Sequence, residues 1–460
     1  MKKKSSLLVT LCFLIGSGSQ ATSLRAQVTP KIQFEKYKLP NGLEVILHED
    51  HSTPIVAVDT WYHVGSGDEQ VGRTGFAHLF EHIMFMGSQN VPVGAFDQML
   101  EAAGANNNGS TTEDRTNYYE TLPSNALQLA LWLDADRMGF LLPTMDLPKV
   151  NLQRDVVKNE RRQRVDNQPY GRADEIILAA LYPKSHPYSW PVIGSMADLS
   201  AASLADVQNF FRTYYAPNNA TLAIAGDFDP ATVKKMVAQY FGSIPRGPQV
   251  KRRTTVPAVV IPRDTFLVLE DKVQLPRLFY TWHSVKGFSK DDAALDILAQ
   301  VLAGDKNSRL YKKLVYELQT AQSVSAFQDG SRLDGKFQID VTPKPGQKVS
   351  DIDRVVQAQI YSVISNGITP RELQRAQNTY KASFLNRLAS VLGKAEVLNS
   401  YNYFVGNPDF VQQDAVRYER VTAVDVQRVA KTYLGRPKII LTVVPEGKKE
   451  MMLTASGGGR

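Results

Sequence analysis

One short stretch, His78–His82 (His-Leu-Phe-Glu-His), constrains this chain more than any other part of its sequence. In a helix, positions 78, 81 and 82 are i, i+3 and i+4, so two imidazoles and one carboxylate share a face. The remaining side chains from 76 to 86 are apolar on every side, which is typical of a buried helix. Buried polar groups need partners, and zinc is one: His78 and His82 would bind it, and Glu81 would take a proton from zinc-bound water.

The alternative interpretation makes both histidines ordinary, hydrogen-bonded core residues. The composition argues against it. With 7 His and 46 Asp plus Glu in 460 residues, the spacing H-x-x-[DE]-H arises by chance about 0.01 times per chain. The order is that of the inverted zincin motif. The stretch therefore predicts a catalytic site with one zinc ion per chain.

A catalytic zinc ion needs a third protein ligand and keeps its fourth position open. The stretch from Leu147 to Gln168 predicts a helix, on which Glu160 continues the stripe formed by Gln153, Val156 and Val157. Glu160 is thus a candidate third ligand, although an exposed acid beside two arginines is the plainer interpretation. The pattern alone leaves four other acids open: Asp97, Glu101, Glu113 and Glu120.

The first 26 residues predict a signal peptide: three lysines, an apolar run at 7–15, then small residues with cleavage after Ala21 or Ala26. We therefore expect a periplasmic or secreted protein, with no later segment able to span a membrane. The single cysteine, Cys12, lies in this leader, so no disulfide or Cys ligand is expected. Cleavage of the leader would also remove up to four positive charges, so the net charge would fall from +7 to about +3. That value gives little reason to expect nucleic-acid binding.

An internal repeat divides the chain. The segment at 206–214 (DVQNFFRTY) recurs at 425–433 (DVQRVAKTY), and Thr60-Trp61 recurs as Thr281-Trp282. We predict a metal-binding domain at 33–245, a linker at 246–263, a homologous domain at 264–449 and a disordered tail at 450–460. The basic cluster at 251–253 is interpreted as a solvated linker, with a binding patch as the alternative. The region matching the metal helix, 293–303, contains no histidine, so only one domain is expected to hold metal.

Smaller elements follow from local patterns. We expect a hairpin at 34–49, a central strand at 55–64, a metal helix capped by Thr74, and helices at 96–103 and 126–142. The Asn/Gly-rich stretch 105–112 precedes an alternating strand at 116–122, which indicates a loop or a sheet edge. An edge near the metal could bind an extended peptide through main-chain hydrogen bonds.

With these residues in place, the chain resembles the pitrilysin family of zinc peptidases, which includes insulin-degrading enzyme and the mitochondrial processing peptidases. It is most similar to the short bacterial members with two domains. The similarity spans nearly the whole chain after the leader and includes GFAHLFEH at 75–82, VVKNER at 156–161 and AGDFDP at 225–230. It implies an α+β fold of two homologous domains, each a mostly antiparallel sheet packed with helices, that together form half of a clamshell.

The resemblance also assigns site residues. The third ligand of the family falls on Glu160, and its substrate-docking edge strand falls on Asn108, Gly109, Ser110 and Thr111. Many members carry a second glutamate seven residues before the ligand; here it is Gln153, which we assign as a residue supporting the metal ligands. The family's substrate-holding Arg and Tyr align with Val315 and Gln322, while Arg309 and Tyr311 lie nearby.

The sequence therefore predicts a zinc endopeptidase that hydrolyses short or unfolded polypeptides in an enclosed chamber. We expect a dimer, and the absent Arg/Tyr pair suggests a heterodimer in which a metal-free homologue supplies it. The alternative is a non-catalytic subunit that binds peptides or serves as a scaffold in a heteromeric peptidase.

Overall fold

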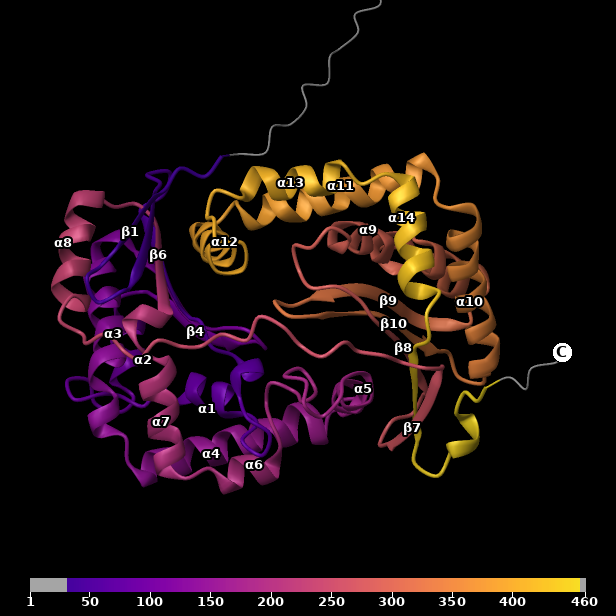
Figure 1. The fold of residues 1–460 in the computed structure, drawn as a ribbon, viewed down its shortest axis with the longest axis horizontal. Coiled ribbons are helices and arrows are strands. Elements are labelled where there is room, and N and C mark those ends of the chain that lie inside the picture. The colour runs from indigo at the N-terminus through magenta and orange to yellow at the C-terminus, as the bar shows by residue number, and fades with distance from the viewer. Residues whose placement is uncertain (1–30, 456–460) are drawn as a thin grey trace, which may run out of the picture.

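The computed structural model describes residues 31–455, and the predicted signal peptide lies outside this range. The described chain forms two mixed β-sheets, each packed with helices, so the predicted α+β class with a duplicated unit is confirmed (Figure 1). None of the helices in residues 31–455 combines the length and apolar character needed to cross a membrane.

The first sheet has six strands in the order β1-β2-β6-β3-β5-β4. Only β2 and β6 run parallel; the other neighbours are antiparallel. The predicted hairpin is β1 and β2, the predicted central strand is β3, and β4 forms an edge. The strands span Glu35–Lys38 (β1), Glu44–Glu49 (β2), Ile55–Tyr62 (β3), Asn106–Thr111 (β4), Thr116–Pro123 (β5) and Ala220–Gly226 (β6).

The second sheet repeats five of these strands in the order β7-β11-β8-β10-β9, again with one parallel pair, β7 and β11. Its edge strand β9 corresponds to β4, which agrees with the sequence repeat. The strands span Thr265–Asp271 (β7), Arg277–His283 (β8), Ala321–Gly330 (β9), Gly335–Pro343 (β10) and Ile439–Pro445 (β11).

One face of each sheet is packed against helices from its own half of the chain. The first core joins strands to α1 (Phe76–Ile83), α3 (Leu127–Phe140), α4 (Leu147–Arg161), α7 (Leu204–Tyr214) and α8 (Pro230–Phe241), with α2 (Ala95–Ala102) and α6 (Met196–Ala201) around them. The second core uses α9 (Asp292–Ala303), α10 (Val349–Asn366), α11 (Pro370–Arg387) and α14 (Ala423–Val429), with α13 (Val411–Glu419) nearby.

The other face of each sheet is covered by a helix from the opposite half. Helix α12 (Val391–Phe404) packs on Ile46, Ala223 and Ala225 of the first sheet. Helix α5 (Ala173–Leu181) packs on the second sheet in return, against a cluster that includes Phe279, Leu441 and Val443. Because apolar surface is buried in both directions, this exchange fixes the two halves to each other. The predicted domain boundaries remain a proposal, since neither half covers its sheet alone.

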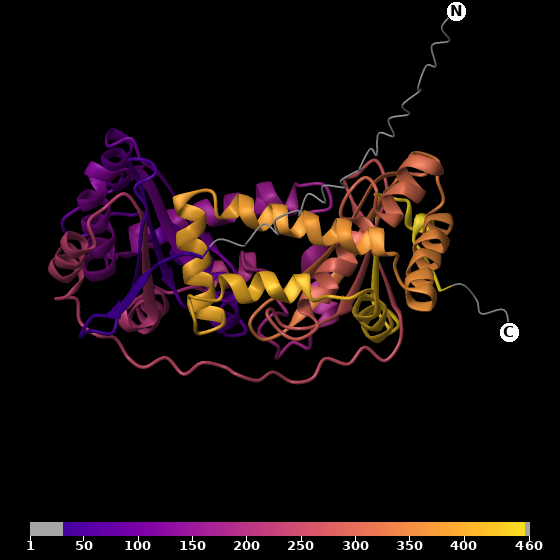
Figure 2. The same ribbon diagram turned by 90° about the horizontal axis from the view of Figure 1, so that it is seen from above.

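Residues 245–264 contain neither helix nor strand and connect the two halves, as Figure 2 shows. Within the basic cluster, Arg252 is not fully solvated. Its guanidinium donates to the Asn219 side chain and lies 5.6 Å from the centre of the Tyr403 ring. The linker is therefore attached to the turn that precedes β6 and to α12.

The predicted disordered tail at 450–460 begins too early. A turn at Lys449–Met451 is followed by Leu453, which is buried in the second core and donates its N–H to Thr442 Oγ1 at 3.1 Å. Burial of the Leu453 side chain stabilises this position, and the apolar run Met451-Met452-Leu453 was the signal for it in the sequence. Residues 456–460 lie outside the described range.

Candidate metal centre

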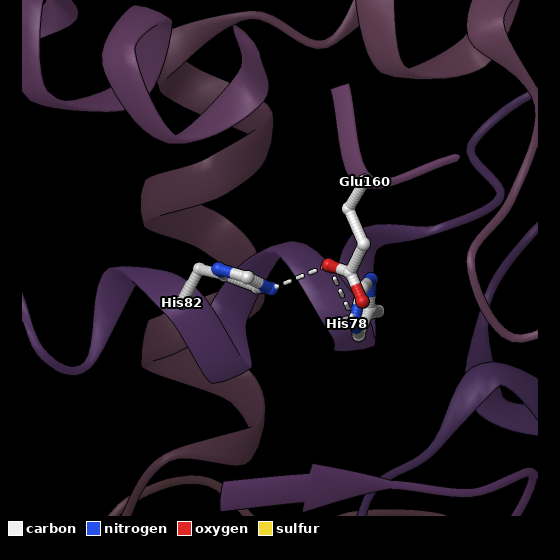
Figure 3. Close-up of side chains that lie close together, drawn as sticks. All are labelled: His78, His82 and Glu160. Carbon is white, nitrogen blue, oxygen red and sulfur yellow. Dashed lines mark ion pairs between the residues drawn. The ribbon is translucent and has the colours of Figure 1, made fainter. Parts of the chain in front are cut away.

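Two helices bring three of the predicted site residues together. His78 and His82 lie one turn apart on α1, and Glu160 lies near the end of α4, facing them (Figure 3). Glu160 Oε2 is 3.6 Å from His78 Nε2 and 3.2 Å from His82 Nε2. Among residues 31–455, this is the one group of three His, Cys, Asp or Glu side chains whose ligand atoms all lie within 4.8 Å.

The other acids that the pattern left open have different partners. Glu120 accepts from Arg137 at 2.8 Å in the core, and Asp97 accepts from Asn107 at 2.8 Å. Neither Glu101 nor Glu113 belongs to a ligand group within the described residues. Helix packing therefore selects Glu160 from a set that sequence spacing could not separate.

The donor set fits a zinc ion. Two imidazole nitrogens and one carboxylate oxygen form the usual catalytic zinc set, and ligand atoms about 3.3 Å apart surround a tetrahedral ion at about 2.0–2.1 Å. Burial lowers the pKa of His78 to about 4, so its ring is neutral at pH 7, as a metal ligand must be. His78 Nδ1 is buried and has no hydrogen-bond partner among the described residues. When Nε2 of a histidine binds metal, its Nδ1–H usually donates to a further acceptor, and no such acceptor is present among the described residues.

The second oxygen of Glu160 is also held. Arg164 lies 2.7 Å from Glu160 Oε1, and a hydrogen bond from His82 keeps the pKa of Glu160 below its usual value. Arg164 belongs to a π-helical turn, Arg162–Asp166, at which α4 changes its winding. The helix predicted from Leu147 to Gln168 is therefore present to Asp166, with a π-helical last turn; such turns often mark functional positions.

The start of α1 is held by a residue that the sequence reasoning missed. Thr74 was predicted as the N-cap, but its hydroxyl donates to Asp198 at 2.6 Å, and the N-cap position is Gly75, at φ +87°. The buried carboxylate of Glu69 accepts the N–H groups of Gly75 at 3.0 Å and Ala77 at 2.8 Å. Burial raises the pKa of Glu69 to about 8. The only signal was an acid shortly before the helix, which suits the positive end of the helix dipole.

Glu81, the predicted general base, lies on the same face of α1 but points toward the edge strand. Its Oε2 accepts a hydrogen bond from Thr111 at 2.6 Å. Burial raises the pKa of Glu81 above its ordinary value, while the Thr111 hydroxyl opposes this change. The candidate base therefore lies on the same helix as the two imidazoles and is bonded to β4.

The ladder between β4 and β5 determines which peptide groups remain free. The N–H of Thr112 donates to Arg115 at 2.9 Å, and the register pairs Ser110 with Asn117. Since hydrogen-bonded pairs alternate along antiparallel strands, residues 106, 108 and 110 bond to β5, whereas the peptide groups of 107, 109 and 111 face the open edge. Of the predicted docking residues, Gly109 and Thr111 therefore direct their peptide groups to this edge, whereas Asn108 and Ser110 do not. In this structure the Gly109 N–H donates to Asn108 Oδ1 at 2.8 Å, a local bond that a docked peptide would replace.

Gln153 does not bond to the site in this structure. Its amide lies against the Met86 sulfur, and among residues 31–455 it makes no hydrogen bond to His78, His82 or Glu160. Its supporting role remains a prediction.

The predicted clamp positions carry no cation or phenol. Val315 lies in a π-helical segment, Tyr311–Glu317, and Gln322 lies at the exposed start of β9. Nearby Arg309 pairs with Glu372, with Nε–Oε1 at 2.7 Å and Nη2–Oε2 at 2.9 Å, and so is engaged within the second half.

Comparison with known proteins identifies the family. Residues 44–190 match the family described as "Insulinase (Peptidase family M16)", and residues 201–380 match "Peptidase M16 inactive domain". A protein named "Zinc protease PqqE" from Helicobacter pylori is 30% identical over 439 residues, covering 93% of this chain and 94% of that protein. The chain belongs to peptidase family M16. It is a zinc protease of that family, in the short two-sheet bacterial form.

Other relatives agree. A probable mitochondrial-processing peptidase β subunit from Arabidopsis thaliana is 24% identical, covering 88% of this chain and 77% of that protein. The crystal structure of a protease from Helicobacter pylori aligns with a TM-score of 0.83 at 26% identity, over 90% of this chain and 100% of that one. The periplasmic protease PqqL from Escherichia coli shares the fold at TM-score 0.75 and 18% identity, and this chain spans 49% of its length.

Proposed function

We propose that this M16 zinc protease is an endopeptidase that hydrolyses short or unfolded polypeptides bound as an added strand along β4. The observation that carries the proposal is the convergence of two imidazoles and one carboxylate, within 4.8 Å of one another, beside a further glutamate and an open sheet edge. The site needs both features, since a zinc peptidase must activate water and also hold the peptide backbone.

His78, His82 and Glu160 would hold one zinc ion per chain. Zinc, when bound, supplies a Lewis acid that makes water more acidic and polarises a carbonyl group. Glu81 then accepts the proton of the attacking water and delivers it to the leaving amine. Its raised pKa suits both steps, because it makes the carboxylate a stronger base for the proton of water and keeps the protonated form populated long enough to pass that proton to the amine.

The edge strand would bind substrate through its main chain. The outward peptide groups of Asn107, Gly109 and Thr111 can pair with an extended peptide, which gives affinity with little dependence on substrate sequence. The family resemblance suggests that the two halves enclose the peptide in a chamber that excludes folded proteins. The N-terminal leader pattern supports a periplasmic or secreted location.

The functional test is Glu81→Gln, with zinc content and cleavage of an unfolded polypeptide measured on the same preparation. We expect one zinc per chain to be retained and cleavage to fall about a thousandfold, since general-base catalysis contributes about 10²–10⁴-fold. Full activity of the variant would remove Glu81 from the mechanism.

The missing clamp supports a second element of the proposal, a partner. Neither Val315 nor Gln322 can replace an Arg/Tyr pair, and Arg309 is already paired with Glu372. We propose a dimer, with a metal-free homologue supplying the pair. The purified chain alone should then cleave poorly and gain activity when co-purified partners are restored; strong cleavage by the isolated chain would contradict this arrangement.

The lack of the Arg/Tyr pair at Val315 and Gln322 also favours one competing function, that of a non-catalytic subunit that binds peptides or serves as a scaffold. That protein would bind unfolded polypeptide whether or not zinc is present and would remain inactive with any partner. Peptide binding and cleavage, each measured with and without zinc, therefore separate the two functions.

A further inference from the structure

The hydrogen bond between Thr111 and Glu81 connects the strand proposed to bind the substrate with the proposed general base. Thr111 Oγ1 donates to Glu81 Oε2 at 2.6 Å, the short distance expected of a hydroxyl bonded to a carboxylate. Both side chains are partly buried, so water competes for this contact less than it would at an open surface.

Because side chains alternate along β4, the residues whose peptide groups face the open edge are also those whose side chains face the general base. Along a strand, residues two apart point their side chains to one face and their peptide groups to one side. Asn107 donates to Asp97 of α2 at 2.8 Å and Thr111 donates to Glu81 of α1, so this set of side chains faces the helices α1 and α2, with Thr111 against the metal helix α1. Ser110, from the other set, bonds to Asn117 instead. The residues that offer peptide groups to a substrate are therefore the ones that face the general base.

Gly109 completes this contact. A Cβ built at position 109 would lie 2.9 Å from Glu81 Cγ, closer than side chains pack. The φ angle of Gly109 is not in the left-handed region, so the absence of a side chain is needed here for space rather than for backbone conformation. The Glu81 side chain thus lies against Gly109 and is held at its end by Thr111.

We propose that Thr111 is a positioning residue for Glu81, which it fixes relative to the strand that docks the substrate, with Gly109 providing the space. This inference rests on the proposed function of Glu81 as general base. With Oε2 bonded to the hydroxyl, Oε1, which makes no hydrogen bond within residues 31–455, can receive the proton of water. Because Thr111 also presents its peptide group to the substrate, one residue sets the distance between the bound peptide and the base.

The direct test compares Thr111→Val, which keeps the shape and removes the hydroxyl, with Thr111→Ser, which keeps the hydroxyl. We expect Thr111→Val to lower kcat about 10- to 100-fold while KM stays within about twofold, because the peptide groups of β4 are unchanged. Thr111→Ser should retain kcat within about threefold. Zinc content and the melting temperature of the metal-free protein should match the unmodified chain in both variants.

Two further variants and one control sharpen the test. Gly109→Ala should lower kcat, because the new methyl group displaces Glu81, with zinc still bound. Adding Thr111→Val to Glu81→Gln should cause no further loss, since the hydroxyl then has no base to position. Thr213→Val, which removes a hydroxyl bonded to Asn209 O within α7, is the matched control and should leave kcat unchanged.

The outcomes separate this inference from the function it rests on. Unchanged kcat in Thr111→Val while Glu81→Gln is inactive would overturn the positioning role alone. Equal loss in the Val and Ser variants, or loss of zinc in either, would overturn it too, by showing a packing role. Activity in Glu81→Gln would instead overturn the proposed mechanism itself.

Discussion

Helices α1 and α9 occupy equivalent places in the two halves, each packed close to the edge strand of its sheet, β4 or β9, yet their polar groups are used differently. On α1, the imidazoles and Glu160 converge on one another, and His78 Nδ1 has no partner among the described residues. On α9, Asp292 pairs with Arg417 at 2.9 Å and Asp296 accepts from the Tyr418 hydroxyl at 2.6 Å.

The contrast shows what the duplicated scaffold does and does not determine. The fold places a helix close to an edge strand twice, but chemistry depends on whether the polar side chains of that helix lack protein partners. Burial raises the pKa of Asp296 to about 7, which makes this acid a poor metal ligand, whereas the pKa of Glu160 is lowered by the hydrogen bond from His82. Among the described residues, the ligand atoms that could hold a cation therefore converge beside α1, whereas the two acids of α9 are bonded to Arg417 and Tyr418.

The largest expected effect comes from neutralising one acid in each half. Glu160→Gln removes the only anionic member of the ligand group, so bound zinc should fall below about a tenth per chain and cleavage should fall at least a thousandfold. Asp296→Asn, the matched change on α9, should leave zinc at one per chain. Elemental analysis and a peptide cleavage assay check both; zinc lost from Asp296→Asn instead would reverse the assignment of the halves.

The exchanged helices offer a comparison in stability. Leu398 on α12 is fully buried against the first sheet, and Ile177 on α5 is 1% exposed against the second. Truncating either to alanine should cost about 2–5 kcal/mol of unfolding free energy through lost burial and a residual cavity. Denaturant titrations of the metal-free protein would measure it.

Each truncation should also shift the unfolding of both halves together, because each helix joins one half to the sheet of the other. A variant in which only one sheet unfolds early, with the second transition unchanged, would show that the exchange does not couple the halves.

The smallest effect concerns His78 and pH in the metal-free protein. The unfolded chain binds a proton at this side chain as pH falls through 6.5, whereas the folded protein, in which the pKa is about 4, does not. Stability is therefore lost between those two values, by up to about 3 kcal/mol. The unfolding free energy of His78→Gln should decline less over this range than that of the unmodified chain, and parallel curves would contradict the lowered pKa.

The sequence predicted the parts of this molecule that depend on local pattern. The spacing of His78, Glu81 and His82 predicted the helix and its polar face, and the repeat predicted two similar sheets. The resemblance, rather than the spacing, singled out Glu160 among five acids, because that choice depends on how α4 packs against α1.

Contacts between distant segments could not be predicted. The exchange of α5 and α12 has no local signal, since an amphipathic helix does not specify which sheet it covers. Glu69, and not the predicted Thr74, accepts the first N–H groups of α1. The N-cap position is Gly75, at φ +87°, and the Thr74 hydroxyl donates to Asp198 instead. The peptide group of Gly109 faces the open edge, and those of Asn108 and Ser110 face β5. This choice depends on the register between β4 and β5, which the sequence of β4 does not specify.

The central claim is that one zinc ion is held by His78, His82 and Glu160 and by no group in the second half. Anomalous diffraction at the zinc absorption edge, from crystals of chain purified without chelator, tests it most directly. The account predicts one strong peak per chain within about 2.0–2.2 Å of His78 Nε2, His82 Nε2 and a Glu160 oxygen. No peak at that place, or a peak beside α9, would contradict it.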